Sequence, residues 1–296
     1  MKLNSILMVL CTMLYSLHTC LIRQFKTLYP DAISSDLVVC YQYLISTVIL
    51  LPFVLRKLTS VKAAITRDTL PYFMGRCSII FISTLSWFYA LSNVSAVNCI
   101  AISCMTPIFI LILAKTSLNE MLNKEVICLA IVAFIGALIV IGPDPYNFNI
   151  ISLFAVLTAF LWAFNSIFTK KHLSPKINSM SIFFVTAIIL SLIALPYVLI
   201  RTHTITLEHI LYLTAVTIVF DTANIILIWV FSRGKISLVA PFDFLRVVFT
   251  TIFSSIMLNE SINSQAIFGI MIILIGNVLA MAYGRESKKK MSLVRL

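Results

Sequence analysis

Four ionisable side chains interrupt long apolar runs of this sequence. They are Arg76, Asp221, Asp243 and Arg246. If these runs cross a membrane, each charged side chain costs about 2.5–3.5 kcal/mol on insertion scales, so a functional role is the first hypothesis. Two of the four are positive and two are negative, and Asp243 and Arg246 are spaced to share one helix face. The functional interpretation is a polar cavity near the membrane centre that binds a charged or zwitterionic solute.

Each of these residues also has a structural interpretation. The four charges could neutralise one another in an ion-pair network. The arginines could instead extend to the cytoplasmic headgroups, because Arg76 lies close to the start of its apolar run. Asp221 lies near the middle of its run, too deep to extend in this way, and is also a candidate proton carrier.

A second set of candidates occurs once in each half of the chain. Tyr15 and His18 align with Trp162 and Asn165 at an offset of 147 residues. An aromatic residue followed one turn later by a polar residue suits the floor of a solute-binding cavity. The alternative is a hydrogen bond between helices next to an aromatic residue at the membrane interface.

None of the sequence patterns typical of enzymes accompanies these candidates. The motifs of serine hydrolases, zinc proteases, P-loop ATPases and dinucleotide-binding folds are absent from the sequence. The seven cysteines all lie in the first half, form no CxxC pair and are interpreted as small apolar residues. We therefore expect no enzyme activity, no catalytic residue, no metal and no cofactor, and any transport would be secondary rather than ATP-driven.

Composition indicates that membrane-spanning helices position these side chains. The 296 residues are 60% hydrophobic and only 11% charged, whereas a soluble domain has roughly 25% charged residues. The apolar runs are continuous rather than alternating, which excludes a membrane β-barrel and leaves α-helices. The sequence therefore predicts an all-α polytopic membrane protein. Ten spans are expected, at residues 3–22, 35–55, 71–91, 95–114, 125–142, 150–169, 178–200, 208–230, 236–257 and 264–283.

The basic residues predict the orientation of these spans. If the N-terminus is cytoplasmic, 17 of the 22 lysines and arginines lie in cytoplasmic segments and 3 lie on the opposite face. The remaining two are Arg76 and Arg246. Such an excess follows the positive-inside rule, and it accounts for the net charge of +11 without a nucleic-acid partner. Both termini are therefore expected in the cytoplasm.

The chain also contains an internal repeat. Residues 92–142 align with residues 232–282 at a constant offset of 140, so that Glu120 corresponds to Glu260. Each half has five spans, an odd number, so the second half enters the membrane from the opposite side. Inverted repeats are typical of carriers that expose one site alternately to the two sides. We expect a first repeat at 1–143, a second at 150–284 and a basic cytoplasmic tail at 285–296.

In these features the chain resembles the drug/metabolite transporter superfamily, EamA type, over its whole length. Two Leu-Asn-Glu segments and two helix glycines, which are interpreted as packing positions, contribute to the resemblance. The segments that carry it are Leu118-Asn119-Glu120, Leu258-Asn259-Glu260, Gly136, Gly276, Ala240-Pro241-Phe242 and Leu161-Trp162-Ala163.

Within this superfamily, the chain is similar to the S-adenosylmethionine uptake carriers of obligate intracellular bacteria. Those carriers have an arginine–glycine pair at the start of the third span, where this chain has Gly75-Arg76. Their ninth span begins Ala-Pro-aromatic-Arg-aromatic-Leu-Glu. Here the charges are exchanged, with Asp243 and Arg246 in place of the arginine and the glutamate. An internal ion pair would survive this exchange, whereas a site that reads the charge of a substrate would not.

The resemblance implies a secondary carrier in a bacterial inner membrane. It would move a small polar metabolite, such as S-adenosylmethionine or an amino-acid-like solute, by alternating access, with coupling to protons or to solute exchange. The alternatives are a metabolite or drug exporter of the same fold and a non-transporting membrane protein. The residues expected to bind the solute are Arg76, Asp221, Asp243, Arg246, His18, Asn165, Trp162 and Tyr15.

Overall fold

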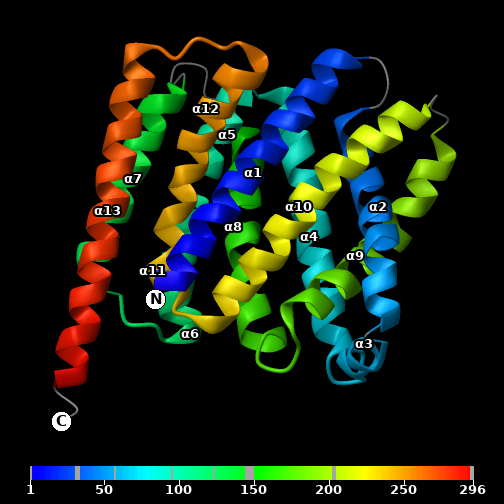
Figure 1. Ribbon diagram of the computed structural model, residues 1–296, viewed down its shortest axis with the longest axis horizontal. Helices are drawn as coiled ribbons and strands as arrows, with labels where there is room; N and C mark the ends of the chain where they lie inside the picture. Colours follow the sequence, from blue (N-terminus) through cyan, green and yellow to red (C-terminus); the bar gives the residue numbers. More distant parts are fainter. Residues whose placement is uncertain are drawn as a thin grey trace.

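The chain forms a bundle of helices (Figure 1). The computed structural model describes residues 2–30, 34–56, 58–94, 96–122, 124–143, 150–201 and 205–293. Every regular element in these ranges is helical. Among the described residues, nine helical segments are long and apolar enough to cross a membrane, and Ser264–Leu279 is a shorter apolar segment. The prediction of an all-α polytopic membrane protein is therefore confirmed.

Eight of the ten expected spans agree with the structure to within four residues at each end, whereas the first and last helices run six and ten residues past their expected ends. In the first half the helices are α1 (Lys2–Leu28), α2 (Ser35–Arg56), α3 (Leu58–Ala64), α4 (Leu70–Asn93), α5 (Ala96–Ser103), α6 (Thr106–Leu118) and α7 (Lys124–Ile141). In the second half they are α8 (Ser152–Phe168), η1 (Thr169–Leu173), α9 (Ser179–Ile200), α10 (Leu207–Arg233), α11 (Ile236–Val239), η2 (Ala240–Phe244), α12 (Leu245–Leu258) and α13 (Ser264–Leu293). The backbone thus remains helical from the last span into the tail expected at 285–296, as far as Leu293.

Spans four and nine are each interrupted, and the interruptions correspond in the repeat. Span four consists of α5 and α6, while span nine consists of α11, the 3₁₀ turn η2 and α12. Pro107 and Pro241, which lack a backbone donor, lie at these interruptions. Ser103, the last residue before the break in span four, corresponds to Asp243 in span nine at the repeat offset of 140 residues. Discontinuous helices at matching positions of two inverted repeats are typical of solute sites in carriers.

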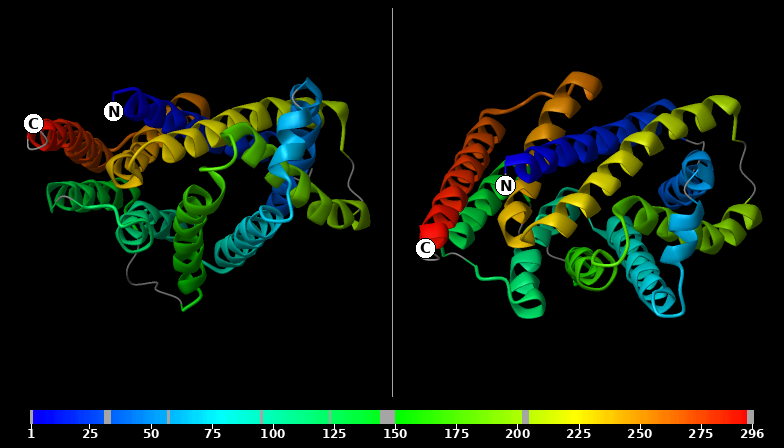
Figure 2. Two further views of the ribbon diagram at one scale, coloured as in Figure 1. Left: turned by 90° about the horizontal axis from the view of Figure 1, so that it is seen from below. Right: turned by 60° about the horizontal axis from the view of Figure 1, so that its bottom comes forward.

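Helix packing follows the same internal symmetry. The α1 helix packs on α10 and α12, and its counterpart α8 packs on α4 and α6, the counterparts of α10 and α12. The other major contacts, α2 with α9 and α7 with α13, join corresponding spans of the two halves. Figures 1 and 2 show these two pairs at opposite sides of the bundle. The two halves are therefore inverted copies of one five-span plan.

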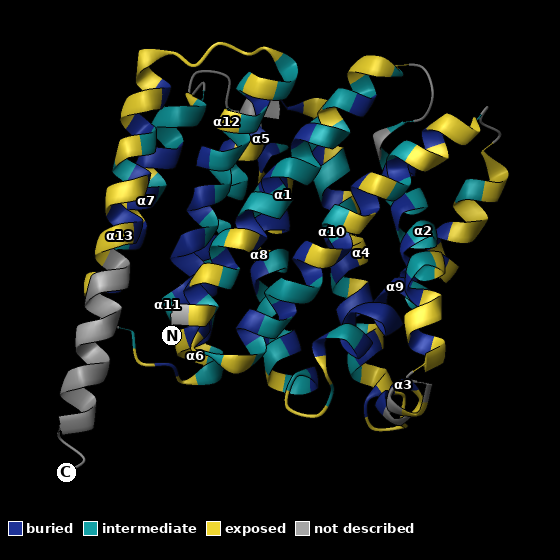
Figure 3. Cartoon of the chain, in the orientation of Figure 1, coloured by how far each residue is buried: buried dark blue, intermediate teal, exposed yellow. Residues whose placement is uncertain are grey.

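Large apolar side chains cover the outside of the bundle. Val48, Leu199 and Ile256 are about 70% exposed, and Figure 3 shows exposed positions along the outer faces of the helices. Polar residues such as Thr12 and Thr217 are instead fully buried. This reversal of the soluble pattern is expected where the surrounding solvent is lipid.

The contact between α7 and α13 depends on glycine. A Cβ atom on Gly269 would lie 2.7 Å from the carbonyl oxygen of Gly136, whereas one on Gly276 would lie 3.3 Å from the carbonyl oxygen of Leu129. We expect Gly269→Ala to lower the thermal unfolding temperature in detergent clearly, because the two backbones must separate. Gly276→Ala should change it much less, and equal effects of the two substitutions would contradict this account.

Candidate functional site

Arg76 lies near the start of α4, with its guanidinium group enclosed by α8, η1 and α9. Its Nε donates to Thr186 Oγ1 at 3.1 Å, and its Nη1 donates to Asn165 Oδ1 at 3.1 Å and to Thr169 Oγ1. The residue is 5% exposed, so its side chain does not extend to the headgroup region. All of these partners are neutral, and no carboxylate pairs with Arg76 within the described ranges. The positive charge is therefore uncompensated.

A cavity adjoins this guanidinium group. It is lined by α4, α8, η1 and α10, and the residues described there include the cations Arg76 and Lys170 and no acidic residue. Trp162 contributes an aromatic ring, and Asn165 and Asn224 contribute amides. Its volume is about 30 Å³, which is room for one or two water molecules, so this lining suits a single small anionic group such as a carboxylate, and a larger solute needs a more open form of the bundle.

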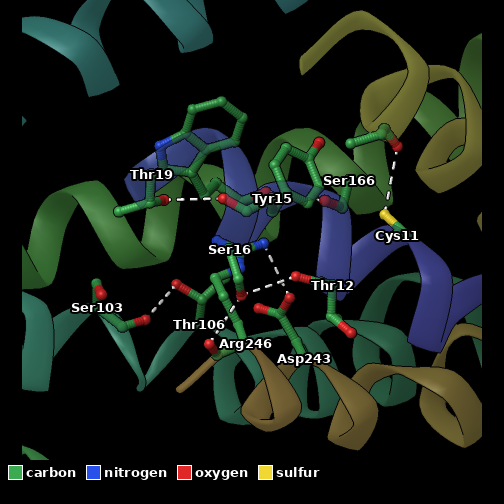
Figure 4. Close-up of polar contacts among 12 residues, drawn as sticks. Cys11, Thr12, Tyr15, Ser16, Thr19, Ser103, Thr106, Ser166, Asp243 and Arg246 are labelled. Atoms are coloured by element: carbon green, nitrogen blue, oxygen red, sulfur yellow. Dashed lines mark hydrogen bonds and ion pairs between the residues drawn. The ribbon is translucent and has the colours of Figure 1, made fainter. Parts of the chain in front are cut away.

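Asp243 and Arg246 lie at the interruption of span nine and pair with each other. Arg246 Nη2 donates to Asp243 Oδ1 at 2.9 Å. The guanidinium carbon lies 4.6 Å from the centre of the Tyr15 ring on α1, and Ser16 Oγ donates to the Arg246 carbonyl oxygen at 2.8 Å (Figure 4). The Arg246 side chain is 42% exposed, and neither Arg246 nor Asp243 is among the described residues that line the Arg76 cavity.

His18 and Tyr15 connect this pair to α10. The His18 ring lies 4.8 Å from the ring of Phe220 between centroids, and the Tyr15 ring lies 6.2 Å from it. His18 Nε2 is also 2.8 Å from Nε2 of Gln42 on α2. Tyr15 thus lies between Arg246 and Phe220 of α10.

Asp221 on α10 lies apart from both arginines. It is 4% exposed, and its Oδ1 accepts a hydrogen bond from Ser46 Oγ on α2 at 2.6 Å. Its Oδ2 has no hydrogen-bond partner, and no ion pair involves it in the part of the chain that the structure describes. The idea that the four buried charges neutralise one another therefore holds only for Asp243 and Arg246.

Two ion pairs at the ends of the bundle were missed by the sequence reasoning. Lys170 Nζ donates to Glu120 Oε1 at 2.8 Å, and Arg23 pairs with Glu260. Glu260 follows Glu120 by 140 residues and Lys170 follows Arg23 by 147, the two offsets at which the halves align. The pairs are therefore internal copies of each other, and combining the offsets would have predicted the second from the first.

The two Leu-Asn-Glu segments place both carboxylates. Asn119 and Asn259 end α6 and α12 in the left-handed conformation, with φ of 51° and 54°. Asparagine, after glycine, is a common residue at this position. The chain then turns, and the N–H groups of Glu120 and Glu260 donate back to the last helical turn. Figure 1 shows the ends of α6 and α12 at opposite ends of the bundle, so the motif presents one glutamate at each end.

The two pairs differ in burial, and we call Glu120–Lys170 the buried ion pair and Arg23–Glu260 the exposed ion pair. The side chains of Glu120 and Lys170 are 7% and 18% exposed, against 46% for both members of the exposed ion pair. Glu120 also accepts hydrogen bonds from the backbone N–H groups of Ile236 and Ser237, each at 3.0 Å, which caps α11. Burial alone would raise the pKa of Glu120, but the hydrogen bonds from Lys170 and Ser237 lower it below its usual value.

Comparison with known proteins identifies the family of this bundle. The model of the EamA-like transporter family matches residues 3–142 and, again, residues 149–282. The chain belongs to the EamA-like transporter family. It is therefore a transporter rather than an enzyme, and the resemblance noted in its sequence is confirmed.

Several EamA relatives have named solutes. The chain is 27% identical to an S-adenosylmethionine uptake transporter of Rickettsia prowazekii, over 90% of this chain and 89% of the relative. It is 30% identical to a riboflavin transporter of Brucella anthropi over 47% and 48% of the two chains, and 23% identical to a pseudopaline exporter of Pseudomonas aeruginosa over 84% and 85%. A solved crystal structure with 14% identity has the same fold, with a TM-score of 0.80 over 96% of this chain and 98% of the other. The EamA chain is thus a multi-pass membrane transporter of small metabolites.

Proposed function

We propose that this EamA transporter is a secondary uptake carrier of a bacterial inner membrane, and that its solute carries a carboxylate bound by Arg76. The uncompensated Arg76 guanidinium group in the cavity is the observation that carries the proposal. A buried guanidinium group with neutral partners gains most from an anionic ligand, because Arg and carboxylate form two parallel charge-assisted hydrogen bonds.

S-adenosylmethionine and amino-acid-like solutes fit this chemistry. S-adenosylmethionine combines a carboxylate with a positively charged centre and a flat purine. Arg76 would bind the carboxylate, Trp162 would contact the purine, and the Asp243–Arg246 pair with Tyr15 would border the rest of the solute. The similarity to the Rickettsia uptake transporter over most of both chains supports this choice.

The two ion pairs support alternating access. Lys170 belongs both to the buried ion pair and to the lining of the Arg76 cavity, so separating it from Glu120 would open the cavity at that end of the bundle. The exposed ion pair is its repeat-related counterpart at the other end. We propose that the carrier alternates by closing one ion pair while the other opens, with the buried ion pair on the cytoplasmic side.

Uptake of radiolabelled S-adenosylmethionine by bacteria that express the chain tests the proposed function. Uptake above empty-vector cells is expected, and unlabelled amino acids should compete only if they are also solutes. Arg246→Ala should reduce uptake by about tenfold, which corresponds to about 1.4 kcal/mol, because it leaves Asp243 without its ion-pair partner at the interruption of span nine. A chain that reaches the membrane but takes up neither S-adenosylmethionine nor any amino acid would contradict the proposal.

An exporter of the same fold is the second candidate, favoured by the similarity to the pseudopaline exporter. The two directions give opposite phenotypes in cells. Export predicts resistance to a toxic solute analogue, whereas uptake predicts sensitivity to it. Growth of an S-adenosylmethionine auxotroph on external S-adenosylmethionine would favour uptake.

Reporter fusions test the proposed orientation. A fluorescent protein fused after Leu296 should fluoresce, because it would remain in the cytoplasm. Alkaline phosphatase inserted between α12 and α13, after Ser261, should be active, because this loop would face the periplasm. The reverse result for both fusions would invert the orientation without changing the fold.

A further inference from the structure

Asp221 is a carboxyl group in the membrane interior that pairs with no opposite charge in the described ranges. It lies near the middle of α10, it is 4% exposed, and its Oδ2 has no hydrogen-bond partner among the described residues. Ser46 Oγ donates to the other oxygen at 2.6 Å. One neutral hydrogen bond does not repay the loss of hydration of an ionised carboxylate in an apolar interior. A group in this position is stable when it holds a proton.

Among the described residues, the elements packed against α10 bring no cation into contact with this carboxyl group. The η1 segment, which also packs on α10, carries Lys170 and Lys171, and Lys170 is paired with Glu120. From α1, Cys11, Tyr15 and His18 contact α10. The membrane part of α9, residues 179–196, contains no charged side chain. On α2, Ser46 is the contact, and the nearest charged residues of that helix are Asp36 and Arg56 at its two ends. No ion pair involves Asp221 among the described residues.

A proton fits the site better than a metal ion does. A cation such as Na⁺ or Mg²⁺ needs several oxygen ligands, and here one carboxylate and one hydroxyl converge. No group of three residues of the kinds His, Cys, Asp and Glu that could hold a metal ion occurs in the described ranges. A proton needs a single unpartnered oxygen, which Asp221 Oδ2 provides.

The position of Asp221 links it to the solute cavity through one helix. Asn224, three residues further along α10 and nearly one turn away, lines the Arg76 cavity, as do Leu227 and Phe231. Phe220, next to Asp221, contacts His18 and Tyr15, which borders Arg246. A change in the charge of Asp221 therefore acts on the helix that forms one wall of the cavity.

From this geometry we propose that Asp221 is the proton-binding site through which this carrier couples solute uptake to the proton gradient. The inference rests on the proposed uptake function and adds the coupling ion to it. In each cycle, one proton binds Asp221 from the acidic side, the bundle reorients with proton and solute bound, and both leave on the other side. Reorientation with an empty, ionised Asp221 is disfavoured, because the unpaired charge would have to move through the closed bundle.

Proteoliposomes that contain the full chain test this inference. Radiolabelled S-adenosylmethionine is offered outside, with the lumen at pH 7.5 and the external pH at 7.5 or 6.5, while a pH-sensitive dye reports the lumen. With the membrane potential held at zero by potassium and valinomycin, one proton per solute and a gradient of one pH unit permit about tenfold accumulation, and the dye should report acidification that depends on the solute. Asp221→Asn should lose both responses. The matched control Asp36→Asn, which changes a partly exposed carboxylate in the first turn of α2, should keep them.

Two further variants test the role of Asp221 even if Asp221→Asn fails to fold. Asp221→Glu retains a carboxyl group and should retain a gradient response. Ser46→Ala removes the donor to Asp221 and should shift the pH at which uptake is half-maximal. Wild-type uptake that ignores the pH gradient, or a gradient response that survives Asp221→Asn, would overturn the coupling site and leave the uptake function intact. Absence of transport of any tested solute by the wild type would overturn the uptake function and the coupling site with it.

Discussion

Replacing Arg76 by alanine is expected to abolish uptake of a carboxylate-containing solute while the chain still folds. The substitution removes the uncompensated guanidinium group from the cavity. Removing one partner of a buried, hydrogen-bonded charge pair costs about 2–5 kcal/mol, and each 1.4 kcal/mol is a factor of ten. We therefore expect the initial rate at low solute concentration to fall by a factor of at least about thirty.

Two of the three hydrogen-bond partners of Arg76 keep another hydrogen bond without it, whereas Asn165 Oδ1 loses its donor, so folding should survive at a cost of about 1–3 kcal/mol. Thr186 Oγ1 also donates to the carbonyl oxygen of Ile182, and Thr169 Oγ1 donates to that of Asn165. Membrane levels and elution in detergent should therefore match the wild type. Arg201→Ala, which removes a largely exposed arginine at the end of α9, serves as the matched control and should transport normally.

A comparison of two solutes tests whether Arg76 binds the carboxylate of the solute. Wild-type carrier should prefer S-adenosylmethionine strongly over its decarboxylated analogue, and Arg76→Ala should lose this preference because the guanidinium group no longer distinguishes the two. Arg76→Lys keeps the charge but not the planar fork, so it should be intermediate. If Arg76→Ala lowers transport of both solutes equally, Arg76 supports the bundle and does not bind the carboxylate.

The arrangement of the spans could be predicted from the sequence because lipid imposes one requirement on every element. Each span needs about 20 apolar residues whose backbone hydrogen bonds lie within the helix. A run of this length is recognisable in the sequence even when the position of each helix end is uncertain by a few residues. The inverted repeat adds an independent check through the offset of 140 residues. The interruptions of spans four and nine were not predicted, although Pro107 and Pro241 lie at them.

The partners of the buried charges could not be predicted, because helix packing decides them. Arg76 meets Thr186 on a helix 110 residues away, and Asp221 meets Ser46 at a distance of 175 residues along the chain. Only Asp243 and Arg246 could be paired from spacing, since they lie on one turn. Asp243 and Arg246 pair with each other. The resembling uptake carriers have an arginine and a glutamate at these two positions, so the exchange of charges in this chain still allows an ion pair.

Breaking the buried ion pair is expected to lower the stability of the chain strongly. The exposed ion pair, its repeat-related counterpart, provides the control. Glu120→Ala removes a carboxylate that pairs with Lys170 and caps α11, and breaking a buried pair in this way costs about 3–5 kcal/mol. Glu260→Ala removes the repeat-related carboxylate from a pair that is 46% exposed on both sides, which costs about 0.2–1 kcal/mol. Thermal unfolding in detergent should therefore separate two substitutions of the same motif clearly.

The same two substitutions should also shift the carrier between its two open states. A cysteine at Ser166, which lines the Arg76 cavity, reports access in a background without other cysteines. With Glu120→Ala, a thiol reagent added from the cytoplasmic side should label this cysteine faster, because the cavity opens where Lys170 loses its partner. With Glu260→Ala, labelling from the opposite side should increase instead. Equal labelling of the two variants from both sides would show that the ion pairs stabilise the bundle without controlling access, and alternating access would then require other contacts.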